Sequence, residues 1–525
     1  MDSFSSLPPY YQLFGNSTPK GWRVSSLETM CLAIVAENMK PVWVNYMADV
    51  HIQELIQSMN MSNRLTPAML HAFLVPNLTV LNLNICQQLV DKTIVQTIRV
   101  QCKNLSTLNL HGCIQIPVEA LVDLIKGLRC LTKLDLSETE CDTEVLLAVG
   151  SSCQKLRELN ISNCRRLSPY SLFYLAYDDD TCSFCCPELE RLSVTGLTSR
   201  VKHQDLIWSL VFVLLVLPKL KVLTHELLEE TLHLIHSKKF DRTQMPCEYS
   251  SLIQLAWCRT FTHTKKGRIT LPLQEVHDVC ASSLPVIFAM CPQLTKLTVI
   301  PPDGQSMSQS SLSYCSLTHL TINCREMNQT KLRELLPVTA VLGVRLQSLS
   351  ISNVIFWDEL SFPTLLSHCA NLHKFSASFS TLPGPGHSRQ LTVQEADCTD
   401  FSLAPLKFPW LSDFSLEYIH TRYPLPSQHQ KILRECLLSL LKHSQVLEVL
   451  NLVHLPFRIC EVFEKVLDPP GSALLRLCEL SVVGYKVPVH TIRQLLSSEN
   501  QLSHLHISCC SRFGRKVYNE TFWRD

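Results

Sequence analysis

Glycine is scarce in this sequence, with 14 among 525 residues, and the charges nearly cancel, with 47 Lys and Arg against 46 Asp and Glu. Few positions can therefore form the glycine-rich loops that hold phosphates, and neither G-x-G-x-x-G nor G-x-x-x-x-G-K-S/T is present. G-x-S-x-G and H-E-x-x-H are missing as well, so we expect no enzyme, no catalytic residue and no cofactor. The near-zero charge gives no reason to expect nucleic acid as a partner.

Long apolar segments are also missing. The longest, Leu206 to Leu217, has 12 residues and ends at Pro218, whereas a membrane-spanning helix needs about 20. We expect a buried core helix or a helix–strand corner there, and no membrane partner. The first 25 residues lack a basic stretch followed by an apolar one, so no secretory signal is readable. We therefore expect a cytoplasmic and/or nuclear protein whose 24 cysteines are reduced thiols.

Leucine is abundant, with 87 residues, and it recurs in the pattern L-x-x-L-x-L/I/V. Strong copies start at Leu78, Leu105, Leu131 and Leu156, at intervals of 27, 26 and 25 residues, which is the period of leucine-rich repeats. Further copies start at Leu189, Leu294, Leu317, Leu346, Leu447, Leu477 and Leu502, with weaker ones at Leu220, Leu372 and Leu411 and a cryptic one at Leu252.

Each repeat predicts one short strand and one helix. The alternation in L-x-L directs the leucines inward and the polar residues outward. Helical patterns follow the strands over 117–128 and 142–153. Asp142 or Thr143 is the expected N-cap of the second helix. A single repeat cannot bury its own apolar face, but stacked repeats can. The predicted fold class is therefore α/β: a curved leucine-rich-repeat solenoid with parallel strands on its concave face.

The expected domain organisation has a flexible N-terminus over 1–24, a helical adaptor or cap over 25–75, the solenoid over 76–510, and a tail or cap over 511–525. Longer intervals after Leu189 predict inserted loops at 177–186, 236–251, 301–311 and 381–400. These loops are either part of a binding face or linkers without a role.

Polar residues on the outward strand positions carry neither sign in excess: Thr79, Asn82, Asn109, His111, Lys133, Asp135, Arg157, Glu158 and Asn160. This mixture favours a protein epitope over a phosphate backbone as the ligand of the concave face. Solubility alone would also require a polar face, and the sequence does not separate the two interpretations.

Cysteines occupy two fixed places in the repeats. Cys86, Cys113, Cys164 and Cys324 follow the strand, and Cys102, Cys153, Cys186, Cys291 and Cys369 lie three residues before the first leucine. The resulting C-x-x-L-x-x-L-x-L-x-x-C resembles the cysteine-containing leucine-rich repeats of ubiquitin-ligase substrate receptors, especially F-box proteins. The resemblance is strong over 76–170 and looser beyond. It implies the fold and only suggests the function.

The segment 25–39 predicts an amphipathic helix, because Leu27, Cys31, Ile34 and Val35 fall on one face. Ser26, Leu27, Cys31 and Val35 also fit the spacing of the BC-box through which VHL-type and SOCS-type receptors bind Elongin C. That resemblance implies that Leu27 enters a pocket of the partner, Cys31 serves as a small apolar residue, and Val35 extends the contact. The alternative is a helix that only caps the first repeat.

BC-box receptors of the Zyg-eleven and Zer-one kind, which this segment resembles, carry a second helical box that selects the cullin. Two stretches have suitable spacing. The first offers Ile52, Leu55 and Met59, with isoleucine where the family has proline; the second offers Pro67, Leu70 and Leu74, with Thr66 where an apolar residue is usual. No L-P-x-P follows, so the resemblance implies cullin-2 in preference to cullin-5.

The most metal-like cluster is C-S-F-C-C at 182–186. Zinc needs four ligands, usually from two pairs, and no second pair follows at finger spacing. We therefore expect no metal, with Cys186 as a repeat cysteine and the other two as loop thiols.

These features favour a substrate-recognition subunit of an Elongin BC–cullin RING ubiquitin ligase, which holds an unidentified target protein on its solenoid. The alternative is a non-catalytic leucine-rich-repeat scaffold or inhibitor. An F-box-like adaptor fits less well, because Leu7 and Pro8 are not followed by a long apolar helical pattern.

Overall fold

The structure is a computed structural model that describes residues 27–178, 183–197, 203–237, 269–301, 316–324, 330–356, 358–380, 406–419, 425, 427–468, 473–484, 487–497 and 500–508. It divides into two compact units, which we describe separately. The N-terminal unit covers the described residues up to 320, and the C-terminal unit covers those from 321 onward.

The N-terminal unit begins with helices and continues as a parallel sheet. The leading helices are α1 (Leu27–Glu37), the 3-10 helix η2 (Pro41–Tyr46), α2 (Asp49–Met61) and α3 (Pro67–Phe73). The strands are β1 (Val80–Asn82), β2 (Thr107–Asn109), β3 (Lys133–Asp135), β4 (Glu158–Asn160), β7 (Arg191–Ser193), β8 (Val222–Thr224), β9 (Glu275–Cys280) and β10 (Lys296–Ile300), hydrogen-bonded in this order. β11 (His319–Asn323) crosses the division between the units.

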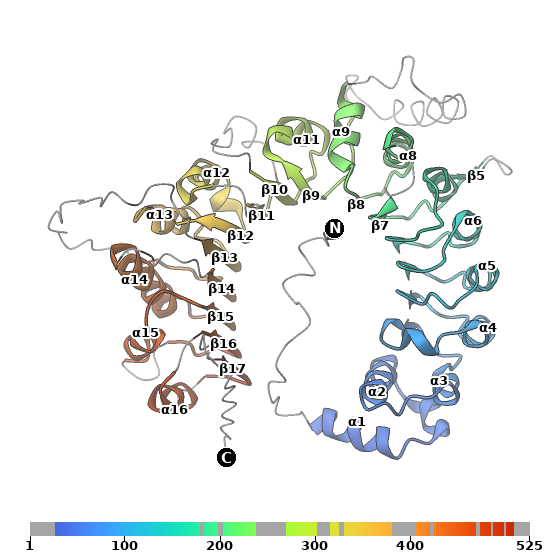
Figure 1. Cartoon of the computed structure of the whole chain (residues 1–525), viewed down its shortest axis with the longest axis horizontal. Helices are drawn as coiled ribbons and strands as arrows, with labels where there is room; N and C mark the ends of the chain where they lie inside the picture. Colours follow the sequence, from blue (N-terminus) through green and yellow to red (C-terminus); the bar gives the residue numbers. More distant parts are fainter. Residues whose placement is uncertain are drawn as a thin grey trace, which may run out of the picture. The chain divides into compact units, whose positions relative to one another are not determined.

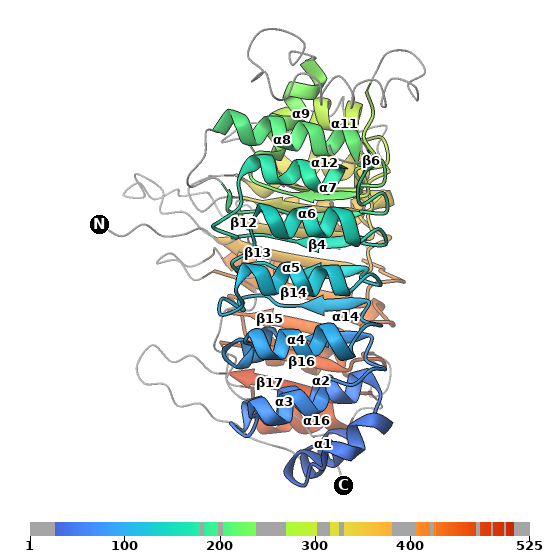
Figure 2. The same cartoon turned by 90° about the vertical axis from the view of Figure 1, so that its right-hand side faces the viewer.

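Helices connect these strands in every repeat. They are η3 (Asn84–Leu89), α4 (Lys92–Gln101), α5 (Val118–Gly127), α6 (Thr143–Ser152), η4 (Pro169–Leu172), α7 (Phe173–Ala176), α8 (His203–Val216), α9 (Leu228–Ser237), η7 (Ala281–Ser283) and α11 (Leu284–Met290). Within this unit the strands line the inner side of an arc and α4 to α9 its outer side (Figure 1). Figure 2 shows α4, α5 and α6 stacked side by side.

The C-terminal unit repeats the design with longer strands. Its strands are β12 (Ser348–Ile355), β13 (Lys374–Ser380), β14 (Asp413–Tyr418), β15 (Val449–Val453), β16 (Glu479–Val483) and β17 (His504–Ser508), paired in parallel in chain order. Its helices are η8 (Leu332–Leu335), α12 (Leu336–Leu342), η9 (Gly343–Arg345), α13 (Ser361–His368), α14 (Ser427–His443), α15 (Ile459–Val466) and α16 (Val489–Ser497). The predicted α/β leucine-rich-repeat solenoid with parallel strands is confirmed.

The repeat leucines form the core, as the alternation predicts. Leu131, Leu134 and Leu136 are at most 2% exposed, and the same three positions are buried in the neighbouring repeats. Asp142 is the N-cap of α6, because its carboxylate accepts hydrogen bonds from the amides of Glu144 and Val145 at 3.0 and 3.2 Å. The prediction of a cap at Asp142 or Thr143 is thus confirmed for Asp142.

The apolar run from Leu206 forms the core helix that the sequence predicts. α8 contains it, and every residue from Leu206 to Val216 is buried. Phe212 packs on Phe173 with ring centroids 4.5 Å apart. Across the described residues, no helix combines the length and the apolar character that a membrane span requires.

The inserted loops lie largely outside the described residues. A short antiparallel hairpin of β5 (Tyr177–Asp178) and β6 (Ser183–Phe184) lies within the 177–186 insertion. The loops predicted at 236–251, 301–311 and 381–400, the cryptic repeat at Leu252, and the terminal segments 1–24 and 511–525 fall wholly or mostly outside the described ranges.

The repeat that contains β9 lies outside the predicted motifs. β8 pairs directly with β9 through Val222 and Glu275, whereas the leucine pattern predicts the next strong repeat after Leu189 at Leu294. The inward residues here are Leu273, Val276 and Val279, at spacings of three and three instead of three and two. Asp278 adopts a left-handed φ of 54°, and this extra residue moves Val279 to the inward position. The leucine pattern is not recognisable here, because the bulge changes the spacing and valines occupy two of the three inward positions.

The amides at the start of β1 need a hydrogen-bond acceptor that a preceding repeat would otherwise supply. In the repeats that follow, two successive amides share one carbonyl: Ser106 and Thr107 both donate to the Thr79 oxygen, at 2.8 and 3.0 Å. At β1 the amides of Thr79 and Val80 donate to the Asp49 carboxylate instead, at 2.9 and 3.1 Å. α2 thus covers the open edge of the sheet with side chains.

Other side chains of α2 complete this cap. The Gln53 side chain accepts from the Asn82 amide at 3.0 Å and donates to the Val80 carbonyl at 3.3 Å. The Asn60 side chain donates to the Ile85 carbonyl at 2.7 Å. α2 therefore acts as the N-terminal cap that a repeat array requires.

The cap predicts that Asp49→Ala destabilises the first repeat. The substitution leaves two strand amides without their acceptor, which we expect to cost about 1 kcal/mol. Hydrogen exchange should show faster exchange at Thr79 and Val80, and the melting temperature should fall. Asp123→Ala is the matched control, because Asp123 only joins Arg99 in an exposed ion pair at 3.5 Å. Equal exchange at these amides in the wild type and Asp49→Ala would contradict the capping role.

Candidate protein-interaction surfaces

α1 carries a stripe of apolar residues that the other described parts of the chain leave exposed. Leu27 begins the helix, one turn before Cys31, and Ser26 lies outside the described residues. Cys31 is exposed and Ile34 is 60% exposed, while Val35 is half-buried and Ala36 is buried. A helix that served only as a cap would bury this stripe, so its exposure leaves room for a partner.

The residues that the spacing nominated for cullin binding lie mostly in the core of the cap. Ile52, Leu55 and Met59 are buried on α2, and Leu70 and Leu74 are buried in and after α3. Pro67 is exposed in the first turn of α3. The cullin contact of these residues stays a prediction, and their present role is packing.

Thr66, which departs from the family pattern, has a local structural role. It is the N-cap of α3, and its hydroxyl accepts a hydrogen bond from the Met69 amide at 3.2 Å. A capping hydroxyl satisfies a helix amide that would otherwise lack a partner.

The polar face of the N-terminal sheet consists of two rows in register. The first row contains Val80, Thr107, Lys133, Glu158, Arg191, Val222, Glu275 and Lys296. The second row begins Asn82, Asn109, Asp135 and Asn160. Lys133 and Glu158 in the first row form an ion pair at 2.9 Å.

The second row is partly engaged in local structure. The side-chain oxygens of Asn109, Asp135 and Asn160 accept hydrogen bonds from amides two residues later, at 2.9, 2.9 and 3.1 Å. Such turns end each strand at the same place. The predicted mixed epitope is therefore, at these positions, also a set of turn-forming residues.

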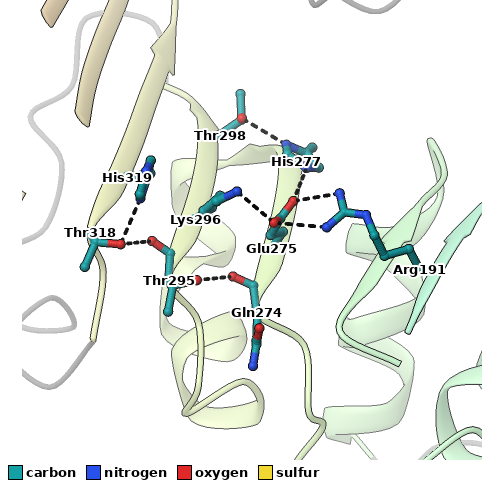
Figure 3. Close-up of polar contacts among 9 residues, drawn as sticks. All are labelled: Arg191, Gln274, Glu275, His277, Thr295, Lys296, Thr298, Thr318 and His319. Atoms are coloured by element: carbon teal, nitrogen blue, oxygen red, sulfur yellow. Dashed lines mark hydrogen bonds and ion pairs between the residues drawn. The ribbon is translucent and has the colours of Figure 1, made fainter. Parts of the chain in front are cut away.

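An ion-pair cluster joins β7, β9 and β10 (Figure 3). The Arg191 guanidinium reaches across β8 and donates two hydrogen bonds to the Glu275 carboxylate, at 3.2 and 3.1 Å. Lys296 Nζ lies 3.0 Å from the same carboxylate. The Glu275 side chain is 11% exposed, whereas Arg191 and Lys296 are 45% and 46% exposed. The leucine pattern does not predict this cluster, because it does not predict β9.

Pairing sets the protonation of the cluster. Burial alone would raise the pKa of Glu275, but the hydrogen bonds from Arg191 and Lys296 outweigh it and hold the pKa of this carboxyl below its usual range. Burial lowers the pKa of His277, against the opposing effect of Glu275. The His277 ring shares a hydrogen bond with the Thr298 hydroxyl at 3.2 Å. The cluster therefore holds one carboxylate, two cations and a neutral imidazole at neutral pH.

The repeat cysteines are buried thiols, as their positions predict. All nine named above are buried. Burial raises the pKa of Cys86 to about 11 and that of Cys102, Cys113 and Cys153 to about 12. Cys164 differs, because a hydrogen bond with Cys141 lowers its pKa.

The C-S-F-C-C stretch is only partly described. Cys182 lies outside the described residues, and Cys185 and Cys186 are buried. Among the residues with described placement, no group of three or more His, Cys, Asp or Glu side chains is arranged to hold a metal ion.

The stacked strand–helix units with buried leucines decide the architecture. The chain is a leucine-rich-repeat protein. No family model matches the sequence of this leucine-rich-repeat protein. It is 29% identical over 87 residues to the F-box/LRR-repeat protein 4 of Bos taurus, a match that covers 17% of this chain and 14% of that protein.

Solved structures include a distant likeness. The yeast Rad7–Elc1 complex structure contains a chain that is 14% identical to this leucine-rich-repeat protein, with a TM-score of 0.44. The match covers 88% of this chain and 94% of that one.

Thiol burial predicts very different alkylation rates for exposed and buried cysteines. At about pH 8 the exposed Cys31 and Cys130 should react with iodoacetamide at least about a hundredfold faster than Cys102 or Cys153, because only thiolates react and the raised pKa keeps buried thiols protonated. Mass spectrometry of the native and the unfolded protein measures the rates. Equal rates at these four cysteines in the native protein would contradict the buried assignment.

His225 replaces a core leucine of the repeat. It occupies the third inward position after Leu220 and Leu223, and its side chain is fully buried. Nδ1 accepts a hydrogen bond from the Leu227 amide at 2.8 Å, so the neutral ring carries its proton on Nε2, 3.5 Å from the Glu226 carboxylate. Burial lowers the pKa of His225, and Glu226 opposes this only in part.

This histidine predicts a pH-dependent loss of stability. The unfolded chain takes up a proton below about pH 6.5, whereas the folded state resists it, so stability is lost as the pH falls from the unfolded towards the folded pKa. His225→Leu removes this proton linkage. The melting temperature of the variant should therefore exceed that of the wild type by more at about pH 5.5 than at pH 7.5. His443→Leu, at an exposed position, is the control. Parallel pH profiles for wild type and His225→Leu would disprove the role of His225.

Proposed function

We propose that this protein is a non-catalytic substrate-recognition subunit of an Elongin BC–cullin RING ubiquitin ligase. The exposed apolar stripe of α1 carries the proposal. Ser26, Leu27, Cys31 and Val35 match the BC-box spacing, and Cys31 and Ile34 are exposed on α1. An apolar helix face laid into a groove of Elongin C would bury them.

The partial sequence match supports the leucine-rich-repeat receptor part of this proposal and does not bear on the Elongin C site. The name of the bovine protein joins an F-box to leucine-rich repeats, the combination that the repeat subtype itself suggests. The F-box-like alternative would need an adaptor-binding helix elsewhere in the chain, and Leu7 and Pro8 lie outside the described residues.

The mechanism would be proximity without bond chemistry. The repeats would hold a target protein while α1 anchors the receptor to Elongin B and C, and the effective concentration of a target lysine near the charged E2 would rise. Cullin-2, favoured over cullin-5 by the missing L-P-x-P, would contact the same helical segment. Among the six nominated residues only Pro67 is exposed, so we assign Ile52, Leu55, Met59, Leu70 and Leu74 an indirect role in shaping that surface.

A scaffold or inhibitor is the second candidate, and the cap formed by α2 favours it. Asp49 and Gln53 show that the segment has a structural role whether or not it binds a ligase. In that case the wild-type protein would capture no ligase subunit, and deletion of residues 1–60 would open the edge of β1 and lead to unfolding or aggregation.

The double variant Leu27→Asp/Cys31→Asp tests the proposal. Charges on the apolar stripe should weaken the binding of purified Elongin B–C at least about tenfold, because carboxylates would be buried in an apolar groove. Pull-down and calorimetry measure the loss. Val50→Asp, at a 63% exposed position of α2, is the control and should bind as the wild type does. Undiminished co-purification of Elongin B and C with the double variant would refute the Elongin C site.

A further inference from the structure

The sheet face of the C-terminal unit is rich in small hydroxyl side chains. Three rows run across its strands in register. The first contains Lys374, Asp413, Val449, Glu479 and His504; the second contains Ser376, Ser415, Asn451, Ser481 and His506; the third contains Ser378, Glu417, Val453, Val483 and Ser508. We call these residues the hydroxyl face. Its middle row contains three serines, Ser376, Ser415 and Ser481, where an extended chain can approach the sheet closely.

Charges in the first row of this face have partners. Lys374 Nζ lies 3.2 Å from the Asp413 carboxylate. The His504 ring, which is a cation only when protonated, lies 3.8 Å from the Glu479 carboxylate. The same rule holds in the N-terminal unit, where Glu275 has two cationic partners.

Glu417 breaks this rule. It is half-buried in the third row, between Ser378 and Val453, and no hydrogen bond or ion pair joins its carboxylate to another described residue. Burial raises the pKa of Glu417, and none of the described residues supplies a cation that opposes this effect. An unpaired carboxylate in a partly desolvated place costs free energy, which a counter-charge would recover.

We propose that the hydroxyl face binds a basic, extended segment of a partner protein, with one Lys or Arg side chain paired to Glu417. Val453 and Val483, the next residues of the third row, offer an apolar surface to the methylene stem of such a side chain. Ser376 and Ser415 offer hydroxyls to the backbone of the segment. The charged face residues support the choice of sign, because Asp413, Glu417 and Glu479 outnumber Lys374.

This inference gives the chemistry of the target that the receptor would hold, and in that sense it rests on the proposed function. The binding itself needs no ligase subunit. The Elongin C site and the basic-peptide site can therefore be tested independently. The double variant Leu27→Asp/Cys31→Asp should bind a basic peptide with the same affinity as the wild type.

Selection from a random peptide library displayed on phage, with the full chain immobilised, tests the proposal. The selected peptides should be enriched in Lys or Arg. A selected peptide should bind Glu417→Gln about tenfold more weakly in fluorescence anisotropy. Glu448→Gln, which neutralises an exposed acid one residue before β15, should bind it like the wild type.

Three outcomes would overturn the proposal: selection without enrichment of basic residues, selection of acidic peptides, or equal binding to the wild type and Glu417→Gln. The melting temperature provides a check on folding. Because Glu417→Gln removes an unpaired carboxylate, the variant should melt no lower than the wild type, and weaker binding then reports the lost charge pair.

Discussion

The N-terminal unit depends on one constraint: the backbone groups at the open edge of its first strand need hydrogen-bonding partners. Within the N-terminal unit, one carbonyl of each repeat accepts two amides of the next, as Thr79 does for Ser106 and Thr107. The first strand has no preceding repeat, and the Asp49 carboxylate takes the place of that carbonyl. This requirement fixes the position of α2, and with it the packing of the whole N-terminal segment.

The cap separates the two roles that the sequence assigned to the N-terminal segment. α2 and α3 bury Ile52, Leu55 and Leu70, so these residues serve the core. α1 keeps Cys31 and Ile34 exposed. A stable protein tolerates such a stripe when a partner covers it, and the same reasoning applies to Glu417, whose carboxylate lacks a counter-charge. Both proposals therefore start from a group whose environment is incomplete in the isolated chain.

Much of the fold was predictable because leucine spacing reports burial directly. The strands after Leu78, Leu105 and Leu131, the cap at Asp142 and the buried core helix from Leu206 are where the pattern places them. β9 was not predictable, because the extra residue Asp278 changes the inward spacing. Side-chain burial in the cap and the pairing of Arg191 with Glu275 were not predictable either, since both depend on contacts between residues far apart in the sequence.

The central claim is that α1, and not the capping helices or the repeats, forms the contact with Elongin C. Hydrogen–deuterium exchange of the full chain, with and without purified Elongin B–C, tests it most directly. The account predicts new protection over Leu27–Glu37, with little change over β1 to β4, whose amides are already bonded within the sheet. Unchanged exchange in α1, or protection confined to the strands, would contradict it.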